Sequence, residues 1–364
     1  MQIRHCDFEG FLALCRQCRV YGFGSGVIAE QFSILMRESG CQDRILGYID
    51  NNASLWGHTK LVGEKDSPIL SPDEIRRLAG PDLLVVVACT DAKGVFEQLS
   101  GYPELEQTQI VFWQLMLSEE LRTQPEPLIP RLYEEPRIPK TIHYCWFGEA
   151  PIPEHLQHFM ASWKEKCPDY EIVRWDESNY DISWNLYMKQ AYESKRWGFV
   201  SDVARLDILY RYGGIYLDTD VELLQNLDPL LYQDGFCGFD IYRFINTGLG
   251  LGTVKGNPVI KALLEEYNGR FFYKPDGTPN LATCILYQYQ TFHRLGVPFN
   301  GKSAQLPHMT IYPAAVLGSY DPFSGVGTPA RGAISLHHYD SAWHTDKLRK
   351  AKQDRIAFFH TLSV

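Results

Sequence analysis

The chain has 364 residues, enough for two domains, and its 45% hydrophobic and 22% charged residues are typical of a folded globular protein. A formal net charge of -9 argues against a general nucleic-acid-binding protein, because such proteins carry a basic surface. No apolar run approaches the length of a membrane-spanning helix, and we expect neither a signal peptide nor an anchor at the N-terminus. Nine cysteines, an odd number scattered along the chain, favour reduced thiols and a cytoplasmic protein.

Residues 1–120 alternate short apolar runs with helical patterns, which predicts a domain built on a parallel sheet. Gly24, Gly26 and Ala29 match the pattern Gly-x-Gly-x-x-Ala between a predicted strand and a predicted helix. Asp50 follows a second predicted strand at roughly the 20-residue distance expected of a ribose-binding carboxylate. The glycines either hold a nucleotide phosphate or only permit a tight turn and close helix packing, and the sequence leaves both interpretations open.

This first domain resembles, especially in the segment Gly47–Asn52, the small Rossmann-like domain at the front of bacterial sugar O-acyltransferases. The resemblance implies a nucleotide or nucleotide-sugar site at Gly24, Gly26 and Asp50. Residues 121–136 follow as a linker, because prolines are interspersed there with charged residues. The remaining residues, 137–364, are predicted to form a second α/β domain.

The stretch Phe199–Leu223 is the most strongly patterned part of the second domain. Apolar residues recur at helical spacing until Gly213 and Gly214, with Ser201 as the expected N-cap, and this predicts a helix on which Asp202 and Arg205 share one face. A short apolar run, Ile215–Leu217, then predicts a buried strand that ends in a pair of aspartates.

Asp218 and Asp220 are spaced so that, in an extended chain, both carboxylates can reach one hard cation. A calcium loop of the EF-hand type is excluded, because its glycine position would be Leu223 and its glutamate position would be Pro229. Magnesium or manganese fits better, since these ions are typically held by one or two carboxylates and the phosphates of a substrate. The alternative is a solvated turn, but the long patterned approach favours the metal site.

Five sequence blocks in residues 137–345 resemble, in the same order, those of glycosyltransferase family 32. The blocks are Ile138–Gly148, Tyr170–Asp176, Ser201–Arg205, Gly213–Asp220 and His337–Trp343. That family contains bacterial capsule and lipopolysaccharide sugar transferases and yeast-type mannosyltransferases, and its core is similar to the clostridial glucosylating toxins. The resemblance does not extend to residues 1–120.

The resemblance implies a GT-A fold and a retaining hexosyltransferase that uses Mn²⁺ or Mg²⁺ and a UDP-sugar or GDP-sugar donor. The implied acceptor is a saccharide or lipid-linked saccharide of bacterial surface polysaccharide synthesis. It also implies a set of metal ligands, Asp218, Asp220, His338 and Ser341, with His337 as a substitute for its neighbour. The sequence cannot decide which of the two adjacent histidines faces the metal.

The donor-binding residues implied by the resemblance are Trp146, Asp202, Arg205, Asp218, Asn246, Ser341 and Trp343. Trp146 would stack on the donor base, and Trp343 would lie over the diphosphate. Asp202, Arg205 and Asn246 would contact the transferred sugar and its phosphate, and are therefore the expected catalytic residues. No covalent nucleophile stands out, so attack by the acceptor on the face that the leaving group departs from is the favoured mechanism.

The sequence is also compatible with two other functions. An NAD-dependent sugar oxidoreductase or epimerase would use the first domain, and a nucleotide-sugar-binding protein without turnover would keep the same fold. The C-terminal segment Lys347–Leu362 combines basic residues with Phe358 and Phe359. It could dock on the inner face of an anionic membrane, but a packed terminal helix with a solvated basic face is the favoured interpretation.

Overall fold

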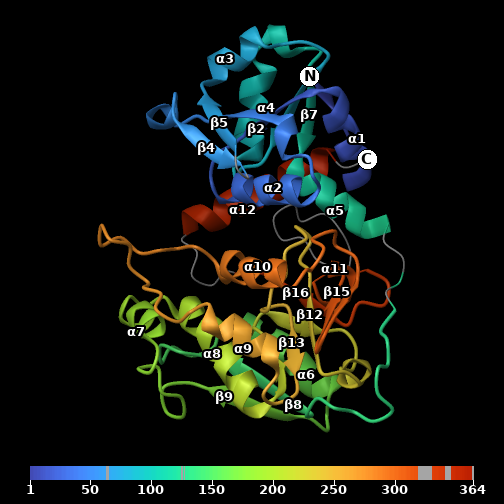
Figure 1. Ribbon diagram of the computed structural model, residues 1–364, viewed down its shortest axis with the longest axis vertical. Coiled ribbons are helices and arrows are strands. Elements are labelled where there is room, and N and C mark those ends of the chain that lie inside the picture. The colour runs from blue at the N-terminus through green and yellow to red at the C-terminus, as the bar shows by residue number, and fades with distance from the viewer. Residues whose placement is uncertain (63–64, 124–125, 127, 319–329, 341–345, 363–364) are drawn as a thin grey trace. The chain divides into compact units, whose positions relative to one another are not determined.

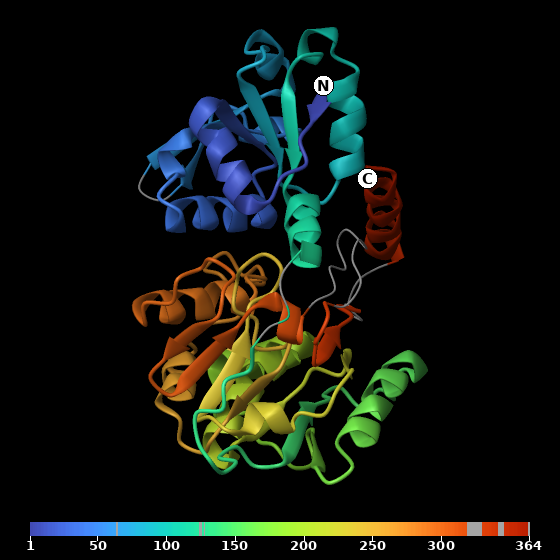
Figure 2. The same cartoon turned by 90° about the vertical axis from the view of Figure 1, so that its right-hand side faces the viewer.

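The computed structural model describes residues 1–364 except 63–64, 124–125, 127, 319–329, 341–345 and 363–364. It forms two compact units (Figure 1). The first comprises Met1–Thr123 together with the C-terminal helix, and the second runs through residues 124–320 and 329–343. In each unit a layer of strands packs against helices (Figure 2).

The first unit is built on a seven-stranded sheet in the order β1-β7-β6-β2-β3-β5-β4. All neighbouring strands pair in parallel except β4 and β5. The strands are β1 (Gln2–Ile3), β2 (Arg19–Phe23), β3 (Ile45–Ile49), β4 (Thr59–Val62), β5 (Lys65–Leu70), β6 (Leu83–Val87) and β7 (Gln109–Phe112). The helices are α1 (Phe8–Gln17), α2 (Val27–Glu38), α3 (Pro72–Arg77), α4 (Ala92–Ser100), α5 (Trp113–Thr123) and α12 (Asp346–Leu362). The central strand β6 is buried along its whole length, as expected of an apolar run in a parallel sheet.

The C-terminal helix α12 packs on the first unit, whereas the predicted boundaries place it in the second domain. Phe358 and Phe359 join the core of the first unit, where Phe359 packs edge-on against Phe112 of β7. Arg355 donates from Nη1 to the carbonyl oxygen of Thr90 at 2.9 Å. Because burial of two phenylalanine rings stabilises the docked helix, α12 is a packed terminal helix and its aromatic residues face protein.

The second unit has a seven-stranded mixed sheet in the order β14-β15-β12-β13-β10-β8-β9, and a separate pair of strands, β11 and β16. The strands are β8 (Thr141–Cys145), β9 (Glu171–Trp175), β10 (Gly214–Tyr216), β11 (Val221–Leu223), β12 (Gly235–Gly238), β13 (Leu251–Thr253), β14 (Ala304–Leu306), β15 (Met309–Tyr312) and β16 (Ser335–His337). The helices are α6 (Glu154–Lys166), α7 (Leu186–Glu193), α8 (Trp197–Tyr212), α9 (Pro258–Glu265), α10 (Cys284–Arg294) and α11 (Ala314–Leu317).

The predicted α/β class is confirmed for both units, because helices alternate with strands that form a largely parallel sheet in the first unit and a mixed sheet in the second. The described part of the predicted linker lies along the second unit, where Leu132 and Tyr133 donate their backbone N–H groups to the carbonyl oxygen of Tyr232. Among the described residues, no helix is long and apolar enough to span a bilayer.

Candidate functional site

Two glycines connect helix α8 to strand β10 and so determine where the aspartates lie. Gly213 and Gly214 both have positive φ, at 72° and 95°. A Cβ on Gly213 would lie 2.8 Å from the backbone nitrogen of Lys255, and one on Gly214 would lie 2.8 Å from the carbonyl oxygen of Thr141. Only glycine satisfies both the conformation and the close approach, so this turn directs β10 into the sheet.

Helix α8 begins five residues earlier than the sequence suggested, because its N-cap is Arg196 and the expected N-cap is Ser201. It starts at Trp197, and the hydroxyl of Ser201 donates to the carbonyl oxygen of Trp197 one turn back. The prediction of Ser201 as the N-cap is therefore wrong, because the residue lies inside the helix and its hydroxyl bonds the preceding turn. The prediction that Asp202 and Arg205 share a face is confirmed.

Strand β10 runs parallel to β8, so the residues that follow both strands meet at one edge of the sheet. Asp218 lies at this edge and accepts a hydrogen bond from the hydroxyl of Tyr216 at 2.9 Å. Trp146, which follows β8, is half-buried and donates its indole N–H to the carbonyl oxygen of Ala150. In the described part of the chain, no hydrogen bond or ring contact joins Trp146 to Asp218, so the predicted base-stacking role stays a prediction.

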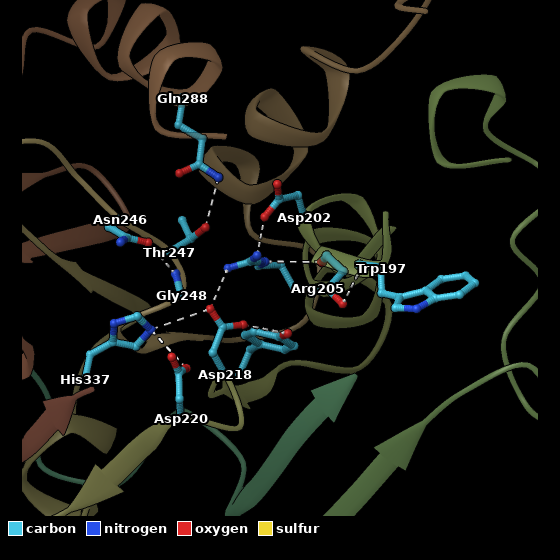
Figure 3. Close-up of polar contacts among 12 residues, drawn as sticks. Trp197, Asp202, Arg205, Asp218, Asp220, Asn246, Thr247, Gly248, Gln288 and His337 are labelled. Atoms are coloured by element: carbon cyan, nitrogen blue, oxygen red, sulfur yellow. Dashed lines mark hydrogen bonds and ion pairs between the residues drawn. The ribbon is translucent and has the colours of Figure 1, made fainter. Parts of the chain in front are cut away.

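Asp218, Asp220 and His337 form a candidate metal site, with one ligand atom of each lying within 4.8 Å of the others (Figure 3). Nε2 of His337 lies 3.2 Å from Oδ1 of Asp220 and 3.8 Å from Oδ2 of Asp218. The antiparallel pairing of β11 with β16 places His337 opposite Val221, directly after the aspartates. This pairing joins the middle of the second unit's sequence to its C-terminal part.

The ionisation of this cluster shows that it is suited to a cation. Although burial favours neutral imidazole, the carboxylates of Asp220 and Asp218 raise the pKa of His337 to about 9. Burial likewise opposes the charge of Asp220, but the adjacent His337 lowers the pKa of that carboxyl to about 2. The site therefore holds a proton between carboxylates, where two oxygen ligands and one imidazole nitrogen fit Mn²⁺ or Mg²⁺.

The sequence-based preference for His338 over His337 is not supported by this geometry. Nε2 of His338 lies 2.8 Å from Oε2 of Glu222, and its ring stacks on Phe159 with centroids 3.8 Å apart. Because adjacent residues of an extended strand face opposite sides, only one of the two histidines can point at the aspartates. The other predicted ligand, Ser341, lies outside the described residues, as does Trp343.

Arg205 connects helix α8 to the candidate metal site. Its Nη2 donates to Oδ1 of Asp202, and its Nη1 lies 3.7 Å from Oδ2 of Asp218. Both Asp202 and Arg205 are buried, and Nη1 of Arg205 makes no hydrogen bond within the described residues. Burial raises the pKa of Asp202, while the two aspartates outweigh burial and keep the pKa of Arg205 well above its ordinary value. The guanidinium therefore stays charged and has a donor to offer to a ligand.

Asn246 and Gly248 lie on the other side of Asp218 and Arg205 from helix α8 (Figure 3). Oδ1 of Asn246 accepts from the backbone N–H of Gly248 at 2.9 Å. A Cβ on Gly248 would lie 2.2 Å from Oδ2 of Asp218, so no side chain fits there. Sequence analysis assigned no role to Gly248 or Tyr216, although the motif Phe244–Gly250 and the tyrosine between the two glycines and the aspartates were visible signals.

In the first unit, the glycine turn after β2 is used for packing. Gly24 has a φ of 101°, and a Cβ there would lie 2.9 Å from the carbonyl oxygen of Ala88. Oδ2 of Asp50 accepts hydrogen bonds from both the backbone N–H and the hydroxyl of Ser25, at 2.9 and 2.6 Å. These contacts account for Gly24 and Asp50 without a ligand, and a nucleotide at Gly24, Gly26 and Asp50 stays a prediction.

The segment that carries these residues is similar to a known protein family. Residues 153–237, which include Asp202, Arg205 and both aspartates, match a family described as "glycosyltransferase sugar-binding region containing DXD motif". The match covers the helix, the glycine turn and the aspartate pair, and it does not reach the first unit.

Several relatives are fungal mannosyltransferases. "Inositol phosphoceramide mannosyltransferase 3" of Schizosaccharomyces pombe is 36% identical over 134 residues, which cover 34% of this chain and 35% of the relative. "Mannosyl phosphorylinositol ceramide synthase SUR1" of Saccharomyces cerevisiae is 30% identical over 244 residues, which cover 64% of this chain and 59% of the relative. The chain therefore spans only part of the length of each of these relatives.

Among solved structures, a "PaToxG glycosyltransferase" aligns with 50% of this chain and 77% of its own, at 18% identity and a TM-score of 0.33. A TM-score this low does not define a shared fold. The assignment of the site therefore rests on the sequence match to residues 153–237 and on the geometry described above.

Proposed function

We propose that the second unit is a divalent-metal-dependent glycosyltransferase that takes a sugar from a nucleotide-sugar donor and retains its anomeric configuration. The observation that carries the proposal is the cluster of Asp218, Asp220 and His337 beside the partly unpaired Arg205, inside a segment that matches a DXD sugar-transferase family. Mn²⁺ or Mg²⁺ is the proposed cofactor.

Each charged group has a distinct part in this proposal. A bound metal ion would neutralise the negative charge that develops on the departing diphosphate. Arg205 would bind a phosphate oxygen through Nη1, the atom that has no hydrogen-bond partner within the described residues. Asn246 and Asp202 would hold hydroxyl groups of the transferred sugar.

Each carboxylate of the site is already bound by a neighbouring donor or cation, which makes it a poor nucleophile. This supports same-face attack by the acceptor without a covalent intermediate. Asp202 accepts from Arg205, Asp218 accepts from Tyr216, and Asp220 lies against His337. None of these carboxylates is free of a donor or a cationic partner. In the proposed mechanism the acceptor hydroxyl attacks the face from which the phosphate leaves, and the phosphate takes its proton.

For the acceptor we propose a saccharide or a glycosylated lipid headgroup. The names of the fungal relatives refer to inositol phosphoceramide, a lipid with a polar headgroup, and this supports the proposal. The role in bacterial capsule or lipopolysaccharide synthesis implied by the family resemblance has no counterpart among these relatives. A cytoplasmic location at the inner face of a membrane remains part of the proposal.

The direct test is metal-dependent hydrolysis of a panel of UDP-sugars and GDP-sugars by the purified chain. We expect slow release of sugar from at least one donor in Mn²⁺, and a loss of about 100-fold or more in Asp220→Ala. Asp169→Ala is the matched control, because its exposed carboxylate only pairs with Lys140 at the surface. If no donor is bound or hydrolysed by the wild-type protein, or if Asp220→Ala hydrolyses it normally, the proposed function is wrong.

A further inference from the structure

Helix α10 contributes a buried glutamine to the surroundings of the candidate site. Gln288 is fully buried, and its Nε2 donates to Oγ1 of Thr247 at 2.9 Å. Thr247 is also fully buried and lies between Asn246 and Gly248. Figure 3 shows the hydrogen bond from Gln288 to Thr247. The backbone N–H of Asp218 donates to the carbonyl oxygen of Gly248, the next residue, at 3.4 Å. One hydrogen bond therefore joins α10 to the turn that packs against the first metal-binding aspartate.

The same helix also contacts the other side of Arg205. Cys284, one helical turn before Gln288, lies close enough to Asp202 and Arg205 for both to act on the pKa of its thiol. Burial raises the pKa of Cys284 well above its ordinary value, so this thiol is neutral and serves as a polar contact. Cys284 and Gln288 are four residues apart, and both therefore project from one face of α10.

The other end of the Gln288 amide is unpaired. Its Oε1 is buried and accepts no hydrogen bond within the described residues. Leaving a buried carbonyl unpaired lowers the stability of a fold, so an apolar residue of the same size would be favoured at a purely structural position. Gln233 shows the contrast, since in the same unit its buried amide has partners at both ends, in Leu230 and Tyr312.

The turn that Gln288 holds has little freedom to move. Its Gly248 leaves so little space that a Cβ would lie 2.2 Å from Oδ2 of Asp218 and 3.1 Å from Nη1 of Arg205. Because the side toward Asp218 is filled, loss of the Gln288 contact would let the turn move only away from the aspartate, which leaves that carboxylate in place. This movement would carry Asn246, whose Oδ1 accepts from Gly248, away from Arg205.

We propose that Gln288 is a positioning residue. Its hydrogen bond holds Thr247 in place, and this fixes the Asn246–Gly248 turn that would contact the transferred sugar. This inference rests on the proposed glycosyltransferase function. Because the metal and the diphosphate would be bound by the aspartates, His337 and Arg205, Gln288 would act on the sugar side of the site. Its loss should reduce turnover and leave binding of a nucleoside diphosphate unchanged.

The test uses Gln288→Met, which keeps the size of the side chain and removes its amide. Binding of UDP and GDP in Mn²⁺ is measured by calorimetry, and hydrolysis is measured with the best donor of the panel. We expect dissociation constants within about twofold of wild type, a kcat at least tenfold lower, and an unchanged or higher melting temperature. Thr247→Val should cause the same loss of kcat. Thr247→Ser, which keeps the hydroxyl, should retain most of the wild-type kcat.

A double mutant and a matched control complete the experiment. If Gln288 acts through Thr247, the double variant Gln288→Met, Thr247→Val should be no slower than either single variant. Gln233→Met, which removes an amide with partners at both ends, should lower the melting temperature and leave kcat unchanged.

The outcomes separate this inference from the proposed function. Normal turnover by Gln288→Met overturns the inference alone, provided that wild-type turnover depends on Mn²⁺ and Asp220. If affinity for UDP or GDP, kcat and melting temperature all fall together in Gln288→Met, Gln288 is a general structural residue, and the inference is overturned as well. Absence of metal-dependent hydrolysis by the wild-type protein overturns both.

Discussion

At the scale of single residues, the candidate site is defined by which polar atoms have partners. Asp202, Asp218 and Asp220 are each engaged by a neighbouring donor or cation, while Nη1 of Arg205 is buried without a hydrogen-bond partner in the described part of the chain. An unpaired buried donor is destabilising unless a ligand satisfies it, so this atom marks the place where an anionic group is expected.

A proton and a metal ion should compete for His337. Since the pKa of this imidazole is raised to about 9, it is protonated at pH 7 in the free protein. Mn²⁺ binding at pH 7 should therefore release about one proton, and the affinity should rise roughly tenfold per pH unit up to about pH 9. Calorimetry in two buffers of different ionisation enthalpy measures the released proton.

Two variants test the assignment of this proton. His337→Asn should bind Mn²⁺ more weakly and release no proton, whereas His338→Asn should behave like the wild-type protein because its ring lies against Phe159 and Glu222. The reverse pattern would show that His338 is the ligand.

Gly248→Ala should inactivate the site by a steric effect. The new Cβ would lie 2.2 Å from Oδ2 of Asp218, so the carboxylate must move. We expect metal-dependent hydrolysis to fall at least tenfold and the free energy of unfolding to fall by about 1–3 kcal/mol. Initial rates in saturating Mn²⁺ and urea unfolding provide the two measurements.

Gly198→Ala is the control for this substitution. It lies in helix α8, a Cβ there would meet nothing within 4 Å, and alanine is the better helix former, so the fold should gain roughly 0.5–1 kcal/mol. An active Gly248→Ala protein would mean that Asp218 can occupy a second position without loss of function.

At the scale of secondary-structure elements, short connections position the site and long-range pairings complete it. The glycine pair after α8 brings β10 beside β8, and the pairing of β11 with β16 brings His337 to the aspartates. The element that differs most from expectation is α12, whose aromatic residues belong to the core of the first unit.

Removal of one α12 ring should destabilise the first unit. Phe359 is 1% exposed and packs on Phe112, so Phe359→Ala should lower the free energy of unfolding by about 3–5 kcal/mol. Chemical denaturation followed by circular dichroism measures this loss. Leu362→Ala, at the partly buried end of the same helix, should cost less. A Phe359→Ala protein of wild-type stability would contradict the docking of α12.

At the scale of the whole molecule, two units with separate sheets and cores share one chain, which crosses between them more than once. All nine cysteines are free, so the described cores are held by packing and hydrogen bonds without disulfide cross-links. The proposed chemistry lies entirely in the second unit. The first unit contains the Gly24 turn and the core against which α12 packs.

The sequence alone determined the features that depend on neighbouring residues. Helical spacing put Asp202 and Arg205 on one face, the apolar run before Asp218 predicted the strand, and the spacing of the two aspartates indicated a metal. These inferences hold because a helix and a strand impose fixed periodicities on residues a few positions apart. The alternation of apolar and helical segments likewise predicted both α/β units.

Contacts between distant residues became clear from the tertiary structure alone. It brought His337 to the aspartates in place of His338, connected Gln288 to the Asn246–Gly248 turn, and placed α12 on the first unit. These contacts depend on strand pairing and on the packing of helices from distant parts of the chain. No local periodicity encodes them, because a residue's neighbours in sequence do not specify which remote surface will cover it.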